Sequence, residues 1–316
     1  MKATILFFVF IVFCLNSFAQ ETKPSAPSIY LSYDYYHYDL KGSSIATTNI
    51  YTFGTTTIDY HLLSATWLFS PTWTLIAFVP YSKTMVETIY EPTATGLNFA
   101  TKDYVGGFND IRLMAVTPLS LNPNYLTMFD IGFTLPTGST DEYFTSSPKQ
   151  RAAYNMQLGS GTPDLYIGTT VTNTMNDLIS TARAQVAIRG GKNAIGYALG
   201  NEFLAKLAST YNLNPYLGVG VSANYKMRGA IQGRDAKYEL FNNYQNGLIS
   251  GDGHQYYHGT QANWDAAAVV KLHTPTFYSV VASFEVGVPF WQGAANKDDI
   301  RIDTRYYLAG NLSTAF

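Results

Sequence analysis

Five ionisable side chains offer the clearest chemistry in this sequence. They are two carboxylates and three guanidinium groups: Asp110, Arg112, Asp164, Arg183 and Arg189. Arg183 and Arg189 alternate with apolar residues, so both fall on one face of an extended strand. Charges of both signs on one face either neutralise each other or create a field that orients a polar solute. We predict that the five line one solute pathway. The alternative is that Asp110 and Asp164 anchor loops to strands.

Arrangements for catalysis or metal binding are weaker. The only cysteine, Cys14, lies in the apolar N-terminal segment. The chain has five histidines: His37, His61, His254, His258 and His273. A serine hydrolase needs a serine within hydrogen-bond reach of a histidine, and no such spacing stands out. His254 and His258, with Asp252, could bind a metal, but a solvated polar loop fits them better. We predict no enzyme activity, no metal and no cofactor.

The elements that must hold these residues are strands of alternating character. From Ile300 to Phe316, even-numbered positions are mainly apolar or aromatic, and odd-numbered positions are charged, polar or small. A strand that crosses an outer membrane needs this alternation, because lipid contacts one face and a wet lumen the other. The sequence therefore predicts an all-β fold, a transmembrane antiparallel up-and-down β-barrel.

The same period of two divides the chain into about twelve strands, an even number as bacterial barrels require. The predicted strands are 29–39, 56–69, 73–89, 110–119, 125–135, 164–174, 178–189, 197–210, 215–228, 261–272, 277–290 and 300–316. Short turns alternate with long connections, among them 40–55, 90–108, 136–162 and 229–258. This pattern places both termini on the periplasmic side, with residues 20–316 as one barrel domain.

Composition and the N-terminus agree with an outer-membrane protein. Charged residues make up 13% of the chain, against about a quarter in soluble domains. Aromatic residues reach 15%, which suits girdles of Tyr and Trp at the two bilayer interfaces. Lys2, the apolar segment 3–13 and Ser17-Phe18-Ala19 predict a signal peptide over residues 1–19. The net charge of −2 gives no basic surface for nucleic acid. We predict a location in the bacterial outer membrane, in contact with its lipid.

Further charged residues stand opposite the aliphatic ones on their strands. They are Asp59, His61, Glu202, Lys206, Lys226, Arg228, Asp265, Lys271 and Glu285. An Arg or Lys that faces lipid at mid-depth costs about 2–4 kcal/mol, so we predict that this set faces the lumen. Both signs occur in similar numbers. The lumen is then either filled by a cross-strand network of ion pairs or open as a wet, polar pathway.

Three glycine-rich segments carry a resemblance to a known family. They are Gly-Gly-Phe-Asn-Asp-Ile-Arg-Leu at 106–113, Phe-Thr-Leu-Pro-Thr-Gly at 133–138 and Leu-Gly-Ser-Gly-Thr-Pro-Asp-Leu at 158–165. In order and spacing the chain resembles the MetA-pathway of phenol degradation family of outer-membrane proteins, often called transporters. The resemblance implies a barrel and the passage of small aromatic compounds, and it implies no catalytic residues.

These observations predict a monomeric outer-membrane channel or transporter. Small solutes, aromatic or hydrophobic compounds among them, would cross by diffusion through the lumen. One alternative is a barrel without a transport task that acts as a surface receptor or scaffold. Its long loops are rich in Tyr and Asn, a composition suited to recognition. The other alternative is an outer-membrane lipid hydrolase. A continuous lumen would favour transport, and a lumen closed by ion pairs would favour the scaffold.

Overall fold

The structure, a computed structural model, describes most of the chain. The described residues are 29–42, 51–90, 99–122, 124–145, 152, 154–233, 261–273, 280–294 and 302–315. The predicted signal peptide at 1–19 lies outside them. So do His254, His258 and Asp252.

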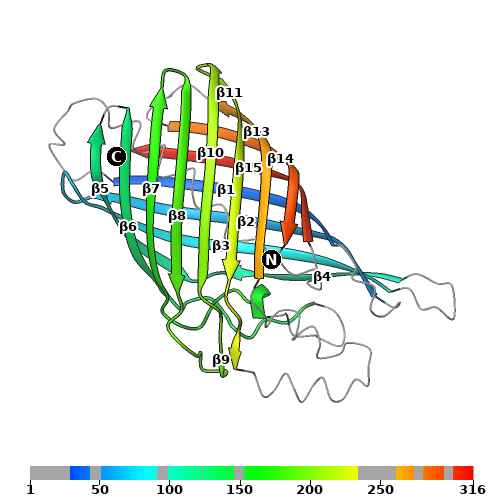
Figure 1. Cartoon of the computed structure of the whole chain (residues 1–316). Helices are drawn as coiled ribbons and strands as arrows, with labels where there is room; N and C mark the ends of the chain where they lie inside the picture. The colour runs from blue at the N-terminus through cyan, green and yellow to red at the C-terminus, as the bar shows by residue number, and fades with distance from the viewer. Residues whose placement is uncertain are drawn as a thin grey trace.

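The described strands form one closed antiparallel barrel (Figure 1). The strands of its wall are β1 (Ile29–Gly42), β2 (Tyr51–Leu68), β3 (Thr74–Tyr90), β4 (Phe99–Phe108), β5 (Ile111–Asn122), β6 (Tyr125–Leu135), β7 (Leu165–Met175), β8 (Leu178–Ile188), β10 (Glu202–Asn214), β11 (Leu217–Arg228), β13 (Gln261–His273), β14 (Val280–Ala294) and β15 (Ile302–Ala315). Pairing of β1 with β15 and of β2 with β3 closes the wall. Since β4 and β5 occupy one position in the wall, the barrel has twelve strands, which confirms the predicted fold class.

Strands β4 and β5 are two parts of one interrupted strand beside β3. Tyr81–Tyr90 of β3 pairs with β4, and Thr74–Phe78 pairs with β5. Between them, the Asn109 amide donates a hydrogen bond of 2.8 Å to the Pro80 carbonyl. The prediction of a loop over 90–108 is therefore wrong for β4. Gly106-Gly107 is typical of a loop, but both residues pair with β3. Glycine is needed at 107 because the Leu158 side chain packs where its Cβ would stand.

The two ends of the barrel differ in their connections. Short turns join β2 to β3, β5 to β6, β7 to β8 and β10 to β11 at one end. At the other end lie the 3₁₀ helix η1 (Tyr154–Met156) and a small sheet that pairs β9 (Tyr197–Ala198) with β12 (Gln232–Gly233) (Figure 1). The predicted strand 197–210 is thus divided into β9 and β10. No helix among the described residues has the length and hydropathy needed to cross a membrane.

Side chains alternate between the lumen and the outer wall along every long strand. On β8 and β10 the prediction holds: Arg183 faces the lumen and is 4% exposed, whereas Leu207 faces outward and is 61% exposed. On β2 the assignment is reversed. Ile58 is buried in the lumen, and its neighbour Asp59 lies on the outer wall.

The prediction that Asp59 and His61 face the lumen is therefore wrong. The lumen beside β2 is packed with aliphatic and aromatic side chains, so the apolar face of this strand turns inward. The cost of about 2–4 kcal/mol that was used to orient the strand applies to Arg and Lys at mid-depth, and the cost for Asp and Glu is smaller. It is therefore too weak a guide for β2, whose outward polar residues are Asp59 and His61.

Candidate functional site in the barrel lumen

Glu202, at the start of β10, is the centre of the densest charge cluster in the lumen. Its Oε1 accepts hydrogen bonds from Arg189 Nη2 at 2.7 Å and from Arg228 Nε at 2.9 Å. Its Oε2 lies 3.2 Å from Lys226 Nζ. Arg189 also donates to Asp164 Oδ2 at 2.5 Å. Two carboxylates thus hold three cations in a buried network, which leaves an excess of one positive charge among these five groups.

A second network lies on β6, β7 and β8. Arg183 Nη2 donates to Asp130 Oδ1 at 2.9 Å, and both side chains are almost fully buried. The other arm of Arg183 donates to Thr170 Oγ1 at 3.0 Å. Next to this network, the Arg112 guanidinium stacks on the Tyr166 ring at 3.7 Å from its centre. Stacking leaves the edge of the guanidinium able to donate hydrogen bonds in the plane of the group.

A third group of polar side chains lies on β11, β13, β14 and β15. Lys271 Nζ lies 3.1 Å from Glu285 Oε2, and the Tyr307 hydroxyl donates to Glu285 Oε1 at 3.0 Å. Asn224 Nδ2 donates to Asp265 Oδ1 at 2.8 Å. Each carboxylate has a partner on an adjacent strand, which is the arrangement expected where charges are taken out of water.

The five predicted pathway residues do not form one ring. Asp164 and Arg189 meet in the Glu202 network, and Arg183 pairs with Asp130 instead. Arg112 lies beside Tyr166. Asp110 lies at the break between β4 and β5, and the hydroxyls of Ser160 and Thr162 connect it to Asp164. Their role in a solute pathway stays a prediction.

Asp110 anchors the connection between β6 and β7. Its Oδ1 accepts a hydrogen bond from the Gly138 amide at 2.9 Å, and its Oδ2 accepts one from the Ser160 amide at 2.8 Å. The Ser160 hydroxyl donates a third at 3.0 Å. A Cβ on Gly159 would lie 2.4 Å from the Gly138 carbonyl oxygen, so only glycine fits there. Burial raises the pKa of the Asp110 carboxyl, while these hydrogen bonds oppose the shift.

We expect Asp110→Ala to loosen this connection without unfolding the barrel. The change leaves the Gly138 and Ser160 amides without their acceptor, at a cost of about 1–3 kcal/mol for each buried group left unpaired, whereas the Ser160 hydroxyl can still donate to the Thr162 carbonyl. Limited proteolysis should then cut between β6 and β7 faster than in the native protein, while heat-modifiable gel mobility stays normal. Asp177→Ala, in the exposed β7–β8 turn, is the control. Equal cleavage rates for the two variants would contradict the anchoring role.

The apolar part of the lumen was not predicted from the sequence. One packed cluster joins inward side chains from four neighbouring strands to a leucine on β10: Leu62, Ile76, Phe78, Met114, Val116, Met128 and Leu204. The signal was present, since these residues alternate with others on their strands. The sequence rule assigned the apolar face to lipid, however. Asp130, also missed, follows Met128 on the same inward face.

Leu204 gives this cluster its importance, because β10 lies several strands away from β2, β3, β5 and β6 around the wall. A single apolar cluster that includes both sides must extend across the lumen at this height. We call it the apolar constriction. Phe78, at 1% exposed, is its largest side chain.

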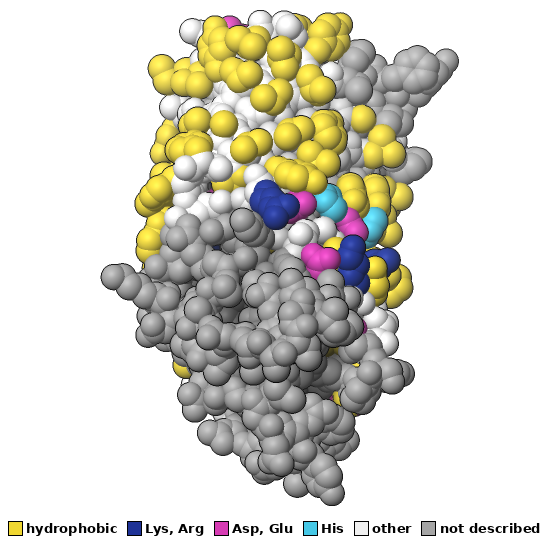
Figure 2. Space-filling view, turned by 90° about the vertical axis from the view of Figure 1, so that its right-hand side faces the viewer, with side chains coloured by type: hydrophobic (Ala, Val, Ile, Leu, Met, Phe, Trp, Pro, Cys, Tyr) yellow, Lys and Arg dark blue, Asp and Glu magenta, His cyan; other side chains and the backbone are white. Residues whose placement is uncertain are grey.

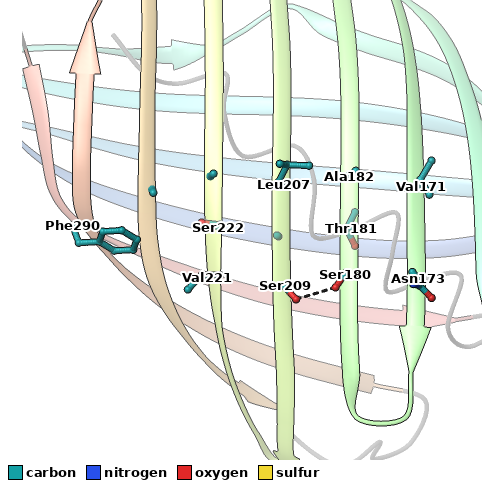
Figure 3. Close-up of a pocket in the computed structure, with 13 residues that line it drawn as sticks. Val171, Asn173, Ser180, Thr181, Ala182, Leu207, Ser209, Val221, Ser222 and Phe290 are labelled. Atoms are coloured by element: carbon teal, nitrogen blue, oxygen red, sulfur yellow. Dashed lines mark hydrogen bonds between the residues drawn. The ribbon is translucent and has the colours of Figure 1, made fainter.

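A depression of about 480 Å³ lies on the outer wall and not in the lumen (Figure 3). Small residues such as Ser180 and Ser209, whose hydroxyls lie 2.9 Å apart, form its floor, and Leu207 and Phe290 rise beside it. Both larger side chains are strongly exposed. The depression therefore lies on the outer face of the wall, and it is separate from any path through the barrel.

Metal binding finds no support in the described part of the chain. No group of three or more His, Cys, Asp and Glu side chains there is arranged to hold a metal ion. The lumen instead offers paired charges, one stacked guanidinium and an apolar constriction.

A closed antiparallel barrel with an apolar outer wall and paired charges inside is the architecture of outer-membrane β-barrel proteins. The COG4313 outer membrane channel from Pseudomonas putida F1 shares this fold, with a TM-score of 0.57 and 12% sequence identity over 93% of this chain and 97% of that one. A FadL homologue from Pseudomonas aeruginosa is a looser match, with a TM-score of 0.38 and 10% identity over 92% of this chain and 90% of that one. The CymD monoaromatic hydrocarbon channel has a TM-score of 0.40 and 7% identity over 91% and 88% of the two chains.

These likenesses show the fold and no more, and the two looser ones carry no argument here. No protein-family model matches the chain, and no curated protein sequence matches it. The resemblance to the MetA-pathway of phenol degradation family therefore stays a prediction.

Proposed function

We propose that this protein is a monomeric outer-membrane channel that passes small solutes through its lumen by diffusion. The observation that carries the proposal is the division of the lumen into two unlike walls. Inward side chains of β1 to β5 are mainly aromatic or aliphatic, and those of β7 to β14 include most of the paired charges. The P. putida neighbour, described as an outer membrane channel, supports the same class of function.

The two walls define the kind of solute that the lumen suits. An aromatic or aliphatic body can slide along Phe78 and Met114, while a polar group exchanges hydrogen bonds with Arg183 or Arg189. An apolar constriction excludes water, so a solute must shed its hydration shell to pass through it. A partly apolar solute has less hydration to lose than an ion, and it therefore crosses at a lower free-energy cost. Small aromatic or hydrophobic compounds that carry one polar group are therefore the proposed solutes. Passage requires the side chains of the constriction to move aside.

Single-channel recording in a planar bilayer tests the proposal. The refolded protein should give small unitary currents, and Arg183→Ala with Arg189→Ala should change their size and shift the selectivity towards cations. The physical reason is that two fixed positive charges leave the lumen while their acidic partners remain. Arg305→Ala removes a positive charge from the outer wall and is the matched control, with no expected change. A silent bilayer from folded protein would overturn diffusion through the lumen.

The packed constriction also gives specific support to a second candidate. A lumen closed by Leu204 and its neighbours suits a surface receptor or scaffold with no transport task. A lipid hydrolase has less support. His37 and His61, the described histidines of the outer wall, contact Asp59 and Tyr33, and neither has a serine as its hydrogen-bond partner in the described structure. We propose that the protein is not an enzyme.

A further inference from the structure

The outer wall carries a polar surface around the middle of β1, β2 and β3. We define it as the outer-wall patch: Tyr33, Tyr35, His37, Asp59, His61 and Lys83. Figure 2 shows charged and histidine side chains gathered below a field of hydrophobic side chains. All six belong to the outward faces of their strands, since the inward alternates such as Asp34, Ile58 and Leu62 are buried.

The patch is held together by its own hydrogen bonds. The Tyr35 hydroxyl donates to Asp59 Oδ1 at 2.7 Å, and His37 Nδ1 lies 2.7 Å from the same oxygen. Tyr33 Oη lies 2.6 Å from His61 Nδ1. Lys83 stands directly opposite Asp59 in the β2–β3 register. The side chains are thus oriented before any ligand arrives, which lowers the entropy lost on binding.

The height of the patch places its charged and histidine side chains in the outer half of the apolar band. From Trp67, near the short-turn end of β2, to Asp59 the strand advances roughly 26 Å, or about 19 Å along the membrane normal at a tilt of about 45°. The apolar band of such barrels is about 25 Å tall. Apolar side chains, Leu63 and Trp67, occupy the outward positions below the patch.

The patch is confined to one side of the barrel. On β7 and β8, outward positions at a similar distance from the short turn are apolar, namely Ile167 and Val186. A general boundary between lipid and water would give polar residues at this height on every strand. At this height β1, β2 and β3 therefore present polar groups to a neighbour, whereas β7 and β8 present Ile167 and Val186.

Aromatic rings and further charges extend the patch. His61 packs edge-on against Tyr81, and Lys83 Nζ lies 5.2 Å from the centre of the exposed Tyr104 ring. On β15, the exposed Arg305 lies beside the patch, 3.7 Å from Asp39. Ring faces pack against the C–H surfaces of a sugar, carboxylates and imidazoles accept its hydroxyls, and Lys or Arg pairs with a phosphate.

We propose that the outer-wall patch binds the phosphorylated sugar head group of a glycolipid in the outer leaflet, lipopolysaccharide being the source. Lys83 and Arg305 contact phosphate, Tyr33 and Tyr35 contact the sugar, and Asp59 with its two partners accepts sugar hydroxyls. The proposal rests on the proposed outer-membrane location, and it is independent of solute passage. Acyl chains of the bound glycolipid then lie along the apolar residues below the patch.

The test measures lipid binding by the refolded full chain in detergent micelles. Fluorescently labelled deep-rough lipopolysaccharide is titrated with protein and followed by polarisation, with phosphatidylglycerol and phosphatidylethanolamine as comparison lipids. Lys83→Gln with Arg305→Gln should weaken lipopolysaccharide binding by about tenfold or more, since two charge-assisted contacts are lost. Binding of the two phospholipids should be unchanged.

A second pair of variants separates a specific site from general surface effects. Tyr33→Phe with Tyr35→Phe should weaken lipopolysaccharide binding several-fold, whereas Tyr211→Phe with Tyr225→Phe, two outward tyrosines on β10 and β11, should not. Equal affinity for lipopolysaccharide in native and patch variants would overturn the proposal. An equal loss of affinity for all three lipids would also overturn it. Self-association of the native protein that the patch variants abolish would overturn it too, and would assign the patch to a second copy of the chain.

Single-channel currents keep this test apart from that of the channel function. All patch variants should conduct as the native protein does, because their side chains lie on the outer wall. Lipopolysaccharide binding by a protein that never conducts would leave the patch supported and the channel rejected. Normal conduction without any patch-dependent binding would support the channel and reject the patch.

Discussion

Glu202→Gln should lower the free energy of unfolding by about 3–5 kcal/mol, the range for removing one partner of a buried ion pair. The neutral amide leaves Arg189, Lys226 and Arg228 close together with Asp164 as their remaining carboxylate. Mutual repulsion among three buried cations then opposes closure of the wall between β8, β10 and β11. Urea unfolding in phospholipid vesicles, followed by tryptophan fluorescence, measures the change.

Glu87→Gln is the matched control for this variant. Glu87 lies on the outward face of β3, and its Oε2 accepts a hydrogen bond from the Thr55 amide, which the glutamine oxygen can also do. Glu87→Gln should lower the free energy of unfolding by less than about 1 kcal/mol. Adding Arg228→Gln to Glu202→Gln should restore part of the lost stability, because one unpaired cation is removed. Equal effects of Glu202→Gln and Glu87→Gln would show that water already screens the network.

Phe78→Ala should have the largest effect on permeation. It removes the largest side chain of the apolar constriction, whose cluster reaches from β3 to Leu204 on β10. The resulting space admits water into the apolar constriction, so unitary conductance should rise at least about twofold as the barrier to wetting falls. Stability should fall by about 3–5 kcal/mol, as for other buried Phe→Ala changes. Planar-bilayer recording and urea unfolding check the two effects.

Phe133→Ala provides the same chemical change on the other face of the wall. Phe133, on β6, points outward and is 47% exposed. Lipid can fill the space that the ring leaves, so this variant should lose only the free energy of transferring the ring from water to lipid, with no added cost of a cavity. Its conductance should not change. If both variants conduct like the native protein, the constriction does not limit permeation.

The strands of the barrel could be predicted from the sequence because a strand with lipid on one side needs an alternation of period two. That pattern is local, and it survives in segments such as Pro215–Arg228 without any knowledge of their neighbours. The alternation identified twelve strands and the inward positions of Arg183, Lys206 and Lys226. It missed β4, since paired glycines usually mark a loop, and the packing of Leu158 that requires glycine at 107 is a tertiary contact.

The local alternation does not determine which face of a strand turns inward, because that depends on packing against distant residues. Alternation separates two faces but does not label them, and β2 shows the consequence. Its apolar face turns inward because Ile58 and Leu62 complete apolar clusters with residues distant in sequence, Tyr307 in one and Leu204 in the other. Asp59 and His61 were then left for the outer wall, where they form part of the patch.

The glycine-rich segments show the same division. The sequence by itself determined the strand pattern and three short motifs, because these depend on the order of neighbouring residues. Only the tertiary structure brought Asp110, Gly138 and Ser160 together at one anchor, and Glu202 together with its three cations. Closure of the barrel decides those contacts, since partners lie on different strands or loops and the energy of a buried charge depends on every group that surrounds it.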